Sequence, residues 1–200
     1  MTVLAAGRPL ADRMLPMEGV ARIAVLCGLA LLGTLILWAS AQIKVPFLPV
    51  PVTLQTLAVP ALAALYGLRL GLATILLYFA EAAMGMPVLT NGGGLVHFAG
   101  PTAGYLLGFV VVTASVGWFA DRYGAERVLP LFATMLAANV VLFALGFAWL
   151  AWGMPLPAGG SGIGVEKAFA AGVAPFVIYD LVKIALAACG VAAASRVIRR

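Results

Sequence analysis

The stretch VLPLFATMLAANVVLFALGFAWLAW, residues 128–152, decides the fold class, because it runs for 25 residues without an acidic or basic side chain. About 20 consecutive apolar residues are enough for an α-helix to cross the hydrocarbon core of a bilayer. The whole chain has the same character, since 64% of its 200 residues are hydrophobic and 10% are charged, whereas soluble domains have roughly 45–50% and about 25%. A water-soluble fold cannot hide that much apolar surface, so the sequence predicts an all-α membrane protein.

Proline, glycine and charged residues divide the chain into six apolar segments, which we expect to be six transmembrane helices. They cover residues 23–43, 52–66, 70–83, 102–120, 128–152 and 174–195. We expect one membrane domain over residues 23–200, after a cytoplasmic segment at residues 1–22. The second and third segments are short for a hydrocarbon core of about 30 Å. Residues 44–52 and 84–100 beside them are therefore expected to dip inward and to form a binding site at that end.

The basic residues predict the orientation of the chain. If the N-terminus is cytoplasmic, only Lys44 and Lys167 face the outside, and the cytoplasmic side holds Arg8, Arg13, Arg22, Arg69, Arg122, Arg127, Arg196, Arg199 and Arg200. Positive charge is enriched in cytoplasmic loops, so we expect both termini in the cytoplasm of a multi-pass protein of the inner membrane. The basic residues are scattered between apolar segments, so nucleic-acid binding is not expected.

Ionisable side chains within the segments mark candidate functional positions, because a charge inside a membrane costs several kcal/mol. Asp180 and Lys183 are three residues apart and share one face of the last helix. Counted from residue 174, they lie about 9 to 14 Å below its outer end. They either belong to a pocket open to the outside or form a neutral pair that only fixes helix packing. Glu81 is either functional or extends toward the outer interface.

Polar and aromatic side chains near the predicted outer side are further candidates. Gln55 carries a donor and an acceptor that suit an uncharged polar ligand group, although Thr53 beside it could act only as a helix cap. The glycine run that follows Asn91 allows the backbone to approach a ligand closely, or forms a plain outer turn. Tyr105 could supply an apolar wall for a ring or belong to the aromatic belt at the membrane interface.

No catalytic site is expected in this chain. The Gly159–Gly160–Ser161–Gly162 run matches the Gly-x-Ser-Gly pattern of rhomboid proteases, but its serine opens no helix. His97, the one histidine, precedes that serine, whereas in those proteases it follows. The chain also lacks a nucleotide-binding Gly-Lys-Ser/Thr motif and any cysteine spacing for a metal. We therefore predict neither an enzyme nor a cofactor.

Small residues four apart let membrane helices pack closely. Ala24 and Gly28 have this spacing on the first segment. They are candidates either for packing within the protein or for a surface that meets a partner membrane protein.

Four motifs follow one another along the chain: Pro51-Val-Thr-Leu-Gln55, Gly85-Met-Pro87, Gly100-Pro-Thr-Ala-Gly104-Tyr105-Leu-Leu-Gly108-Phe109 after the glycine run, and Pro175-Phe-Val-Ile-Tyr-Asp180-Leu-Val-Lys183. In this order they resemble the BioY family, the substrate-capture (S) components of biotin transporters of the energy-coupling factor (ECF) type. The resemblance extends over about residues 23–195. It departs from the family pattern at Tyr179 and Ala103, where the family often has glycine.

The resemblance implies a six-helix protein in membrane lipid that captures biotin from outside. It also implies association with a transmembrane coupling protein and two cytoplasmic ATPases that hydrolyse the ATP. The family's binding residues correspond to Asp180, Lys183, Asn91, Gln55 and Tyr105. Asp180 suits the ureido N–H groups of biotin, and Lys183 or Asn91 its carbonyl, but Lys183 suits the carboxylate tail equally well. A transporter for another small ligand, a membrane enzyme and a helix-packing protein are the other classes considered.

Overall fold

The computed structural model describes residues 19–46 and 48–198 of the chain. Its α-helices are α2 (Val20–Gln42), α3 (Gln55–Ala83), α4 (Ala103–Tyr123), α5 (Val128–Ala148), α6 (Val165–Gly172) and α7 (Val177–Ile198). The remaining elements are the strands β1 (Lys44–Val45) and β2 (Val52–Thr53), the 3-10 turn η1 (Leu95–Phe98) and the π-helical turn η2 (Trp149–Gly153). The structure is mostly helical, as predicted, with one short hairpin of β1 and β2. Five helices in the described ranges, against the six predicted segments, are long and apolar enough to cross a membrane.

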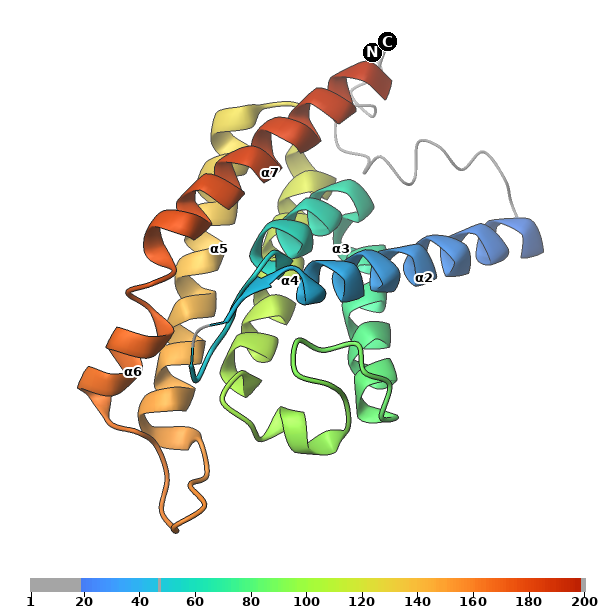
Figure 1. The fold of residues 1–200 in the computed structure, drawn as a ribbon. Coiled ribbons are helices and arrows are strands. Elements are labelled where there is room, and N and C mark those ends of the chain that lie inside the picture. The colour runs from blue at the N-terminus through green and yellow to red at the C-terminus, as the bar shows by residue number, and fades with distance from the viewer. Residues whose placement is uncertain (1–18, 47, 199–200) are drawn as a thin grey trace.

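Helix α3 contains all of the short segment predicted at residues 70–83 and most of the one predicted at residues 52–66, whose first two residues form β2 instead. It is broken at Gly67, whose φ of 76° lies in the left-handed region that glycine adopts without steric cost. The carboxylate of Asp121 accepts the Leu68 N–H at 3.0 Å and so caps the second half. The two halves, teal and green in Figure 1, therefore run in different directions without a loop between them.

The last two helices differ from the prediction. The connection expected over residues 153–172 contains the short helix α6, and α7 begins at Val177 instead of residue 174. Asp180 consequently lies in the first turn of α7, nearer the start of the helix than predicted. A helix N-terminus carries partial positive charge, which favours a carboxylate at that position.

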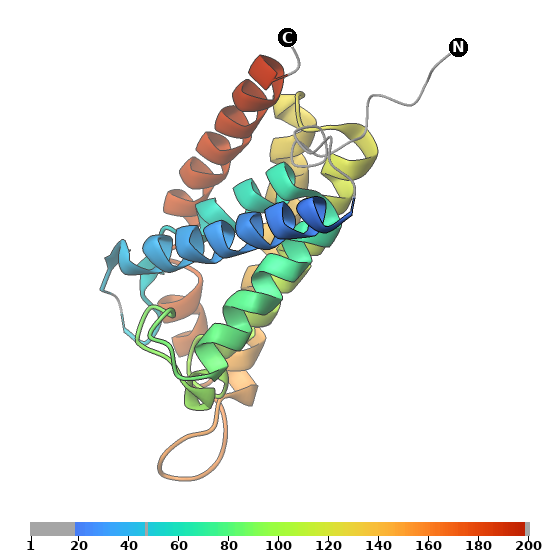
Figure 2. The same ribbon diagram turned by 90° about the vertical axis from the view of Figure 1, so that its right-hand side faces the viewer.

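The helices pack around α3 and α4. Helix α4 lies between α3 and α5, α7 packs on α3 and α5, and α2 packs mainly on α3, with a smaller contact to β2. Figures 1 and 2 show α2 crossing the other helices at one side of the bundle. Helices α4 and α5 approach so closely that a Cβ on Gly108 would lie 2.8 Å from Leu142 Cα. Gly108 therefore allows these two helices to pack closely.

Helix α2 uses one face for packing and exposes the other. Ala30, Gly33 and Thr34 are buried against α3, where a Cβ on Gly33 would lie 2.5 Å from Thr74 Cγ2. Ala24 and Gly28 are exposed, and nothing lies within 4 Å of the position of a Cβ on Gly28. Their predicted role at a partner surface stays a prediction.

The loops expected to form a site lie at one end of the bundle. The hairpin of β1 and β2 extends toward the same end as the glycine-rich loop 84–102 and the loop 154–164 (Figure 1). Most of the predicted cytoplasmic segment 1–22, with Arg8 and Arg13, lies outside the described residues, as do Arg199 and Arg200.

Candidate ligand site

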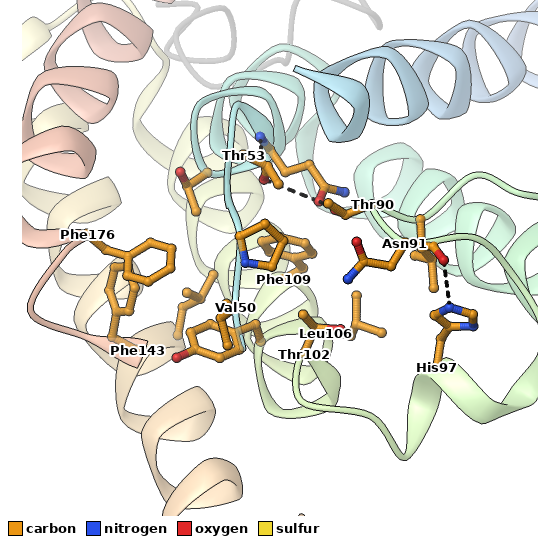
Figure 3. A pocket seen from close by; sticks show the side chains of 16 residues that line it. Val50, Thr53, Thr90, Asn91, His97, Thr102, Leu106, Phe109, Phe143 and Phe176 are labelled. Carbon is orange, nitrogen blue, oxygen red and sulfur yellow. Dashed lines mark hydrogen bonds between the residues drawn. The ribbon is translucent and has the colours of Figure 1, made fainter. Parts of the chain in front are cut away.

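A small cavity of about 50 Å³ lies under these loops. Its lining comes from the hairpin and the start of α3, from the loop before α4, from α4 and α5, and from the residue before α7. The lining residues are Val50, Pro51, Thr53, Gln55, Thr56, Leu89, Thr90, Asn91, His97, Thr102, Tyr105, Leu106, Phe109, Leu142, Phe143 and Phe176. Figure 3 shows these side chains converging from elements far apart in the sequence. The cavity thus has a polar side formed by the hairpin and loop, and an aromatic side formed by the helices.

Gln55 is the best-fixed polar group of the cavity. Its amide Nε2 donates to the hydroxyl of Tyr78 at 3.0 Å, and its Oε1 accepts from Thr90 Oγ1 at 3.3 Å. Thr53 also accepts the Gln55 N–H at 3.2 Å, so Thr53 does hydrogen-bond the start of α3 while Gln55 lines the cavity. This network holds the Gln55 side chain in one orientation.

Asn91 is held at the cavity by its backbone, and its side chain is left available. A tight turn pairs Leu89 with Gly92, and His97 Nε2–H donates to the Asn91 carbonyl at 3.1 Å. In Figure 3 the Asn91 carboxamide points toward Phe109 and Leu106. An amide placed in this way can donate to or accept from a polar group of a ligand.

Lys44 joins the two loops that border the cavity. Its ammonium donates to the carbonyl of Thr90, and this bond ties the hairpin to the glycine-rich loop. The start of α3 also meets its end, through the Gln55–Tyr78 hydrogen bond. Helix α3 therefore folds back on itself, and both of its ends lie beside the cavity.

Three aromatic rings form the opposite wall. Tyr105 lies 6.4 Å from Phe176 and 6.1 Å from Phe143 between ring centroids, and Phe143 lies 5.5 Å from Phe176. The Tyr105 hydroxyl donates to the Gly172 carbonyl at 2.7 Å. Such a wall suits an apolar ring system. Neither Phe143 nor Phe176 was predicted as a site residue. Nothing in the local sequence distinguishes Phe143 from other apolar residues of its span, whereas Phe176 lies in the motif that ends at Lys183, and that motif was the signal that could have indicated it.

Asp180 and Lys183 do not line the cavity but lie behind Thr53 and Thr56, which do. They form an ion pair of 2.7 Å between Lys183 Nζ and Asp180 Oδ1. Thr56 donates to the same Oδ1 at 2.9 Å, and Lys183 donates to the Thr53 carbonyl at 2.8 Å. Asp180 is 1% exposed, and its Oδ2 has no hydrogen-bond partner among the described residues. The structure therefore brings Gln55, Asn91 and Tyr105 to the cavity surface and connects the charged pair to it through two threonines.

Glu81 has a local partner. Its carboxylate accepts a hydrogen bond from Thr34 Oγ1 at 3.0 Å, which ties α2 to the second half of α3. No group of three or more histidine, cysteine or acidic side chains in the described ranges is arranged to hold a metal ion.

The fold and the cavity define a multi-pass helical membrane protein with a small ligand site near one end of its helix bundle. Comparison with known sequences gives the particular family: the BioY family model matches residues 16–200, and the chain belongs to this family. A probable biotin transporter BioY of Pyrococcus horikoshii is 37% identical over 149 residues, which cover 74% of this chain and 82% of the relative. The biotin transporter BioY of Rhizobium etli is 35% identical over 154 residues, covering 73% and 78%.

A solved structure has the same fold. It is described as the S-component for biotin from an ECF-type ABC transporter, and it superposes with a TM-score of 0.75 over 90% of this chain and 95% of its own. The two sequences are 19% identical, so the likeness concerns the fold alone. The fold of this chain therefore matches a known fold over most of its length.

Proposed function

We propose that this protein captures biotin at the outer face of the inner membrane and takes part in its uptake as the S component of an ECF-type transporter. The observation that carries the proposal is a cavity with the side-chain amides of Gln55 and Asn91 on one side and three aromatic rings on the other, in a chain of the BioY family. Its relatives are named as biotin transporters. Transport requires energy, and in this proposal a transmembrane coupling protein and two cytoplasmic ATPases supply it by hydrolysing ATP.

The chemistry of biotin suits the two sides of the cavity. Its ureido ring offers two N–H donors and a carbonyl acceptor, which Asn91 and Gln55 can pair with. Its bicycle is apolar and fits against Tyr105, Phe143 and Phe176. In this proposal Asp180 and Lys183 hold Thr53 and Thr56 in place and supply charge close to the ligand.

We also propose that the chain crosses the membrane six times, with both termini in the cytoplasm, and that residues 23–200 form one membrane domain. The support lies in α3, whose two ends meet at the cavity through the Gln55–Tyr78 hydrogen bond. If each half of α3 crosses the bilayer, the six spans follow. The arginine-rich ends then lie on the cytoplasmic side.

Equilibrium binding of radiolabelled biotin to the purified full-length protein tests this function. We expect saturable binding that unlabelled biotin displaces. Asn91→Ala should weaken binding about tenfold, the equivalent of roughly 1.4 kcal/mol for one lost hydrogen bond. Gln42→Ala, an exposed amide at the end of α2, is the matched control and should bind as the wild type does. Absence of biotin binding to the wild-type protein would rule out the proposal.

A further inference from the structure

The glycine-rich loop brings Asn91 to the cavity on a segment of backbone that is hard to order. Asn91 is followed by three glycines, of which Gly92 and Gly94 adopt φ of 123° and 100°, in the left-handed region. Glycine loses more conformational freedom than any other residue when a chain becomes ordered. The glycine run therefore cannot hold Asn91 in one position by itself, and a contact from elsewhere is needed to fix it.

His97 supplies this contact from beyond the glycines. Its Nε2–H donates to the Asn91 carbonyl at 3.1 Å and so joins two residues that are six apart in the chain (Figure 3). Within the described part of the chain, this is the one hydrogen bond that reaches Asn91. The imidazole ring also lies beside Gly92, where an added Cβ would be 3.5 Å from Cε1 and Nε2. His97 therefore fixes the backbone from which the Asn91 carboxamide extends.

The loop is attached separately on either side of Asn91. Before it, the Thr90 carbonyl accepts a hydrogen bond from the Lys44 ammonium. After it, the Gly94 N–H donates to the Ala82 carbonyl at 2.7 Å, which ties the loop to the end of α3. Loss of the imidazole bond is therefore expected to free Asn91 without detaching the loop from the protein.

The same hydrogen bond determines which nitrogen of His97 carries the proton. Nε2 faces a carbonyl oxygen, which can only accept, so Nε2 is the donor and Nδ1 is the acceptor of the neutral ring. Nδ1 is buried and has no hydrogen-bond partner among the described residues. His97 therefore acts on the loop through Nε2 alone, and another side chain with an N–H at the same reach should be able to replace it.

We propose that His97 is a positioning residue of the ligand site, which raises the affinity for the ligand by fixing Asn91 before the ligand arrives. This inference rests on the proposed function, in which the Asn91 carboxamide pairs with the ureido ring of biotin. A polar group that is ordered in advance loses less conformational entropy on binding, and the ligand binds more tightly for that reason. The effect of His97 on affinity consequently passes through Asn91.

Substitutions at position 97 separate the hydrogen bond from the ring. In equilibrium binding of radiolabelled biotin to the purified full chain, His97→Phe keeps a ring beside Gly92 but has no donor. It should raise the dissociation constant about fivefold, the loss expected for one hydrogen bond. His97→Gln restores an N–H at similar reach and should bind within about twofold of wild type. Val96→Phe, at an exposed neighbouring position that does not line the cavity, is the matched control and should also bind as the wild type does.

A double-mutant cycle with Asn91→Ala tests whether the effect passes through Asn91. Without the carboxamide there is no side chain to position, so in this background His97→Phe should change the dissociation constant by less than about twofold. The same loss in both backgrounds would show that His97 only supports the loop, and it would overturn the inference. Wild-type affinity in the single variant His97→Phe would overturn it as well.

A pair of amide variants gives the same test without a ring at position 97, in case His97→Phe does not fold. His97→Gln and His97→Asn both offer an N–H, but the asparagine side chain is one methylene shorter and does not reach the Asn91 carbonyl. His97→Asn should therefore bind about fivefold more weakly than His97→Gln, and equal dissociation constants would overturn the inference. Failure of the wild-type protein to bind biotin would instead reject the proposed function, and the inference with it, so the two failures are distinguishable.

Discussion

At the scale of single residues, the ion pair of Asp180 and Lys183 can stabilise helix packing and can also contribute to ligand binding. The carboxylate is fully buried in the first turn of α7, and its charge is balanced by Lys183 at 2.7 Å. Breaking a buried ion pair leaves one charge without compensation, which commonly costs about 3–5 kcal/mol, whereas replacing both partners by neutral side chains is often tolerated. Comparing a single replacement with a double replacement of the pair therefore distinguishes a role in packing from a role in binding.

We expect Asp180→Asn alone to destabilise the protein by roughly 3 kcal/mol, because Lys183 then keeps its charge with the neutral oxygens of Thr53 and Thr56 as its remaining partners. The double variant Asp180→Asn/Lys183→Met should recover most of that stability and still bind biotin at least tenfold more weakly than wild type. Thermal unfolding in detergent and equilibrium binding measure the two effects separately. Wild-type affinity in the double variant would mean that the pair only fixes helix packing.

At the scale of elements, the break in α3 brings its two ends together beside the cavity. Gly67 adopts φ 76° there, and a Cβ on Gly117 of α4 would lie 2.8 Å from the backbone of Leu68. The neighbouring helix therefore packs directly on the break. The loops that border the cavity depend on this geometry, because Gln55 and Tyr78 lie in different halves of α3.

Gly67→Ala should destabilise the protein by about 1–3 kcal/mol, since a residue with a Cβ is strained at this φ. The matched control is Gly190→Ala in α7, where nothing lies within 4 Å of an added Cβ. That control should be neutral or stabilising by up to about 1 kcal/mol, because alanine favours a helix interior. Thermal unfolding of both variants in the same detergent measures the difference, and equal melting temperatures would contradict this account of the break.

Helix α2 exposes Ala24 and Gly28, the two residues predicted at a partner surface. A tryptophan at Gly28 should leave biotin binding unchanged but reduce association with the coupling protein at least tenfold, because Gly28 is exposed and touches no other helix. Ile36→Trp is the control, on an exposed position about 80° round the same helix. Co-purification of the coupling protein with each variant is the measurement. Equal recovery with both variants would remove Ala24 and Gly28 from the partner surface.

At the scale of the whole molecule, the cavity and most of the polar loops gather at one end, while the charged turn between α4 and α5 lies at the other. The Lys44–Thr90 hydrogen bond joins the residues that precede α3 to those that follow it. Six crossings explain why the two ends of α3 lie together, because each half of α3 then crosses the membrane once and both ends lie on the same side.

Cysteine accessibility in whole cells tests this topology, after replacement of Cys27 and Cys189 by serine. A membrane-impermeant maleimide should label Met84→Cys and Ser161→Cys from outside. Arg69→Cys, at the break of α3, and Arg127→Cys should react only after permeabilisation. All four positions are exposed in the structure. Labelling of Arg69→Cys in intact cells would contradict two crossings by α3.

The sequence by itself determined the membrane class, the positions of most apolar helices and the residues that carry the chemistry. Hydropathy is a local property, and the length of an apolar run is enough to indicate a span, as in residues 128–152. Gln55, Asn91, Tyr105, Asp180 and Lys183 were predicted as a site from their polarity, position and family resemblance, and the structure brings three of them to one cavity.

Only the tertiary structure decided how these groups are arranged. The charged pair lies behind Thr53 and Thr56, and Phe143 and Phe176 complete the aromatic wall. Glu81 is paired with Thr34 from a different helix. These are contacts between residues far apart in the chain, and they depend on how closely helices approach at glycines such as Gly108. Such contacts leave no local periodicity in the sequence, because they are set by packing between elements and not within them.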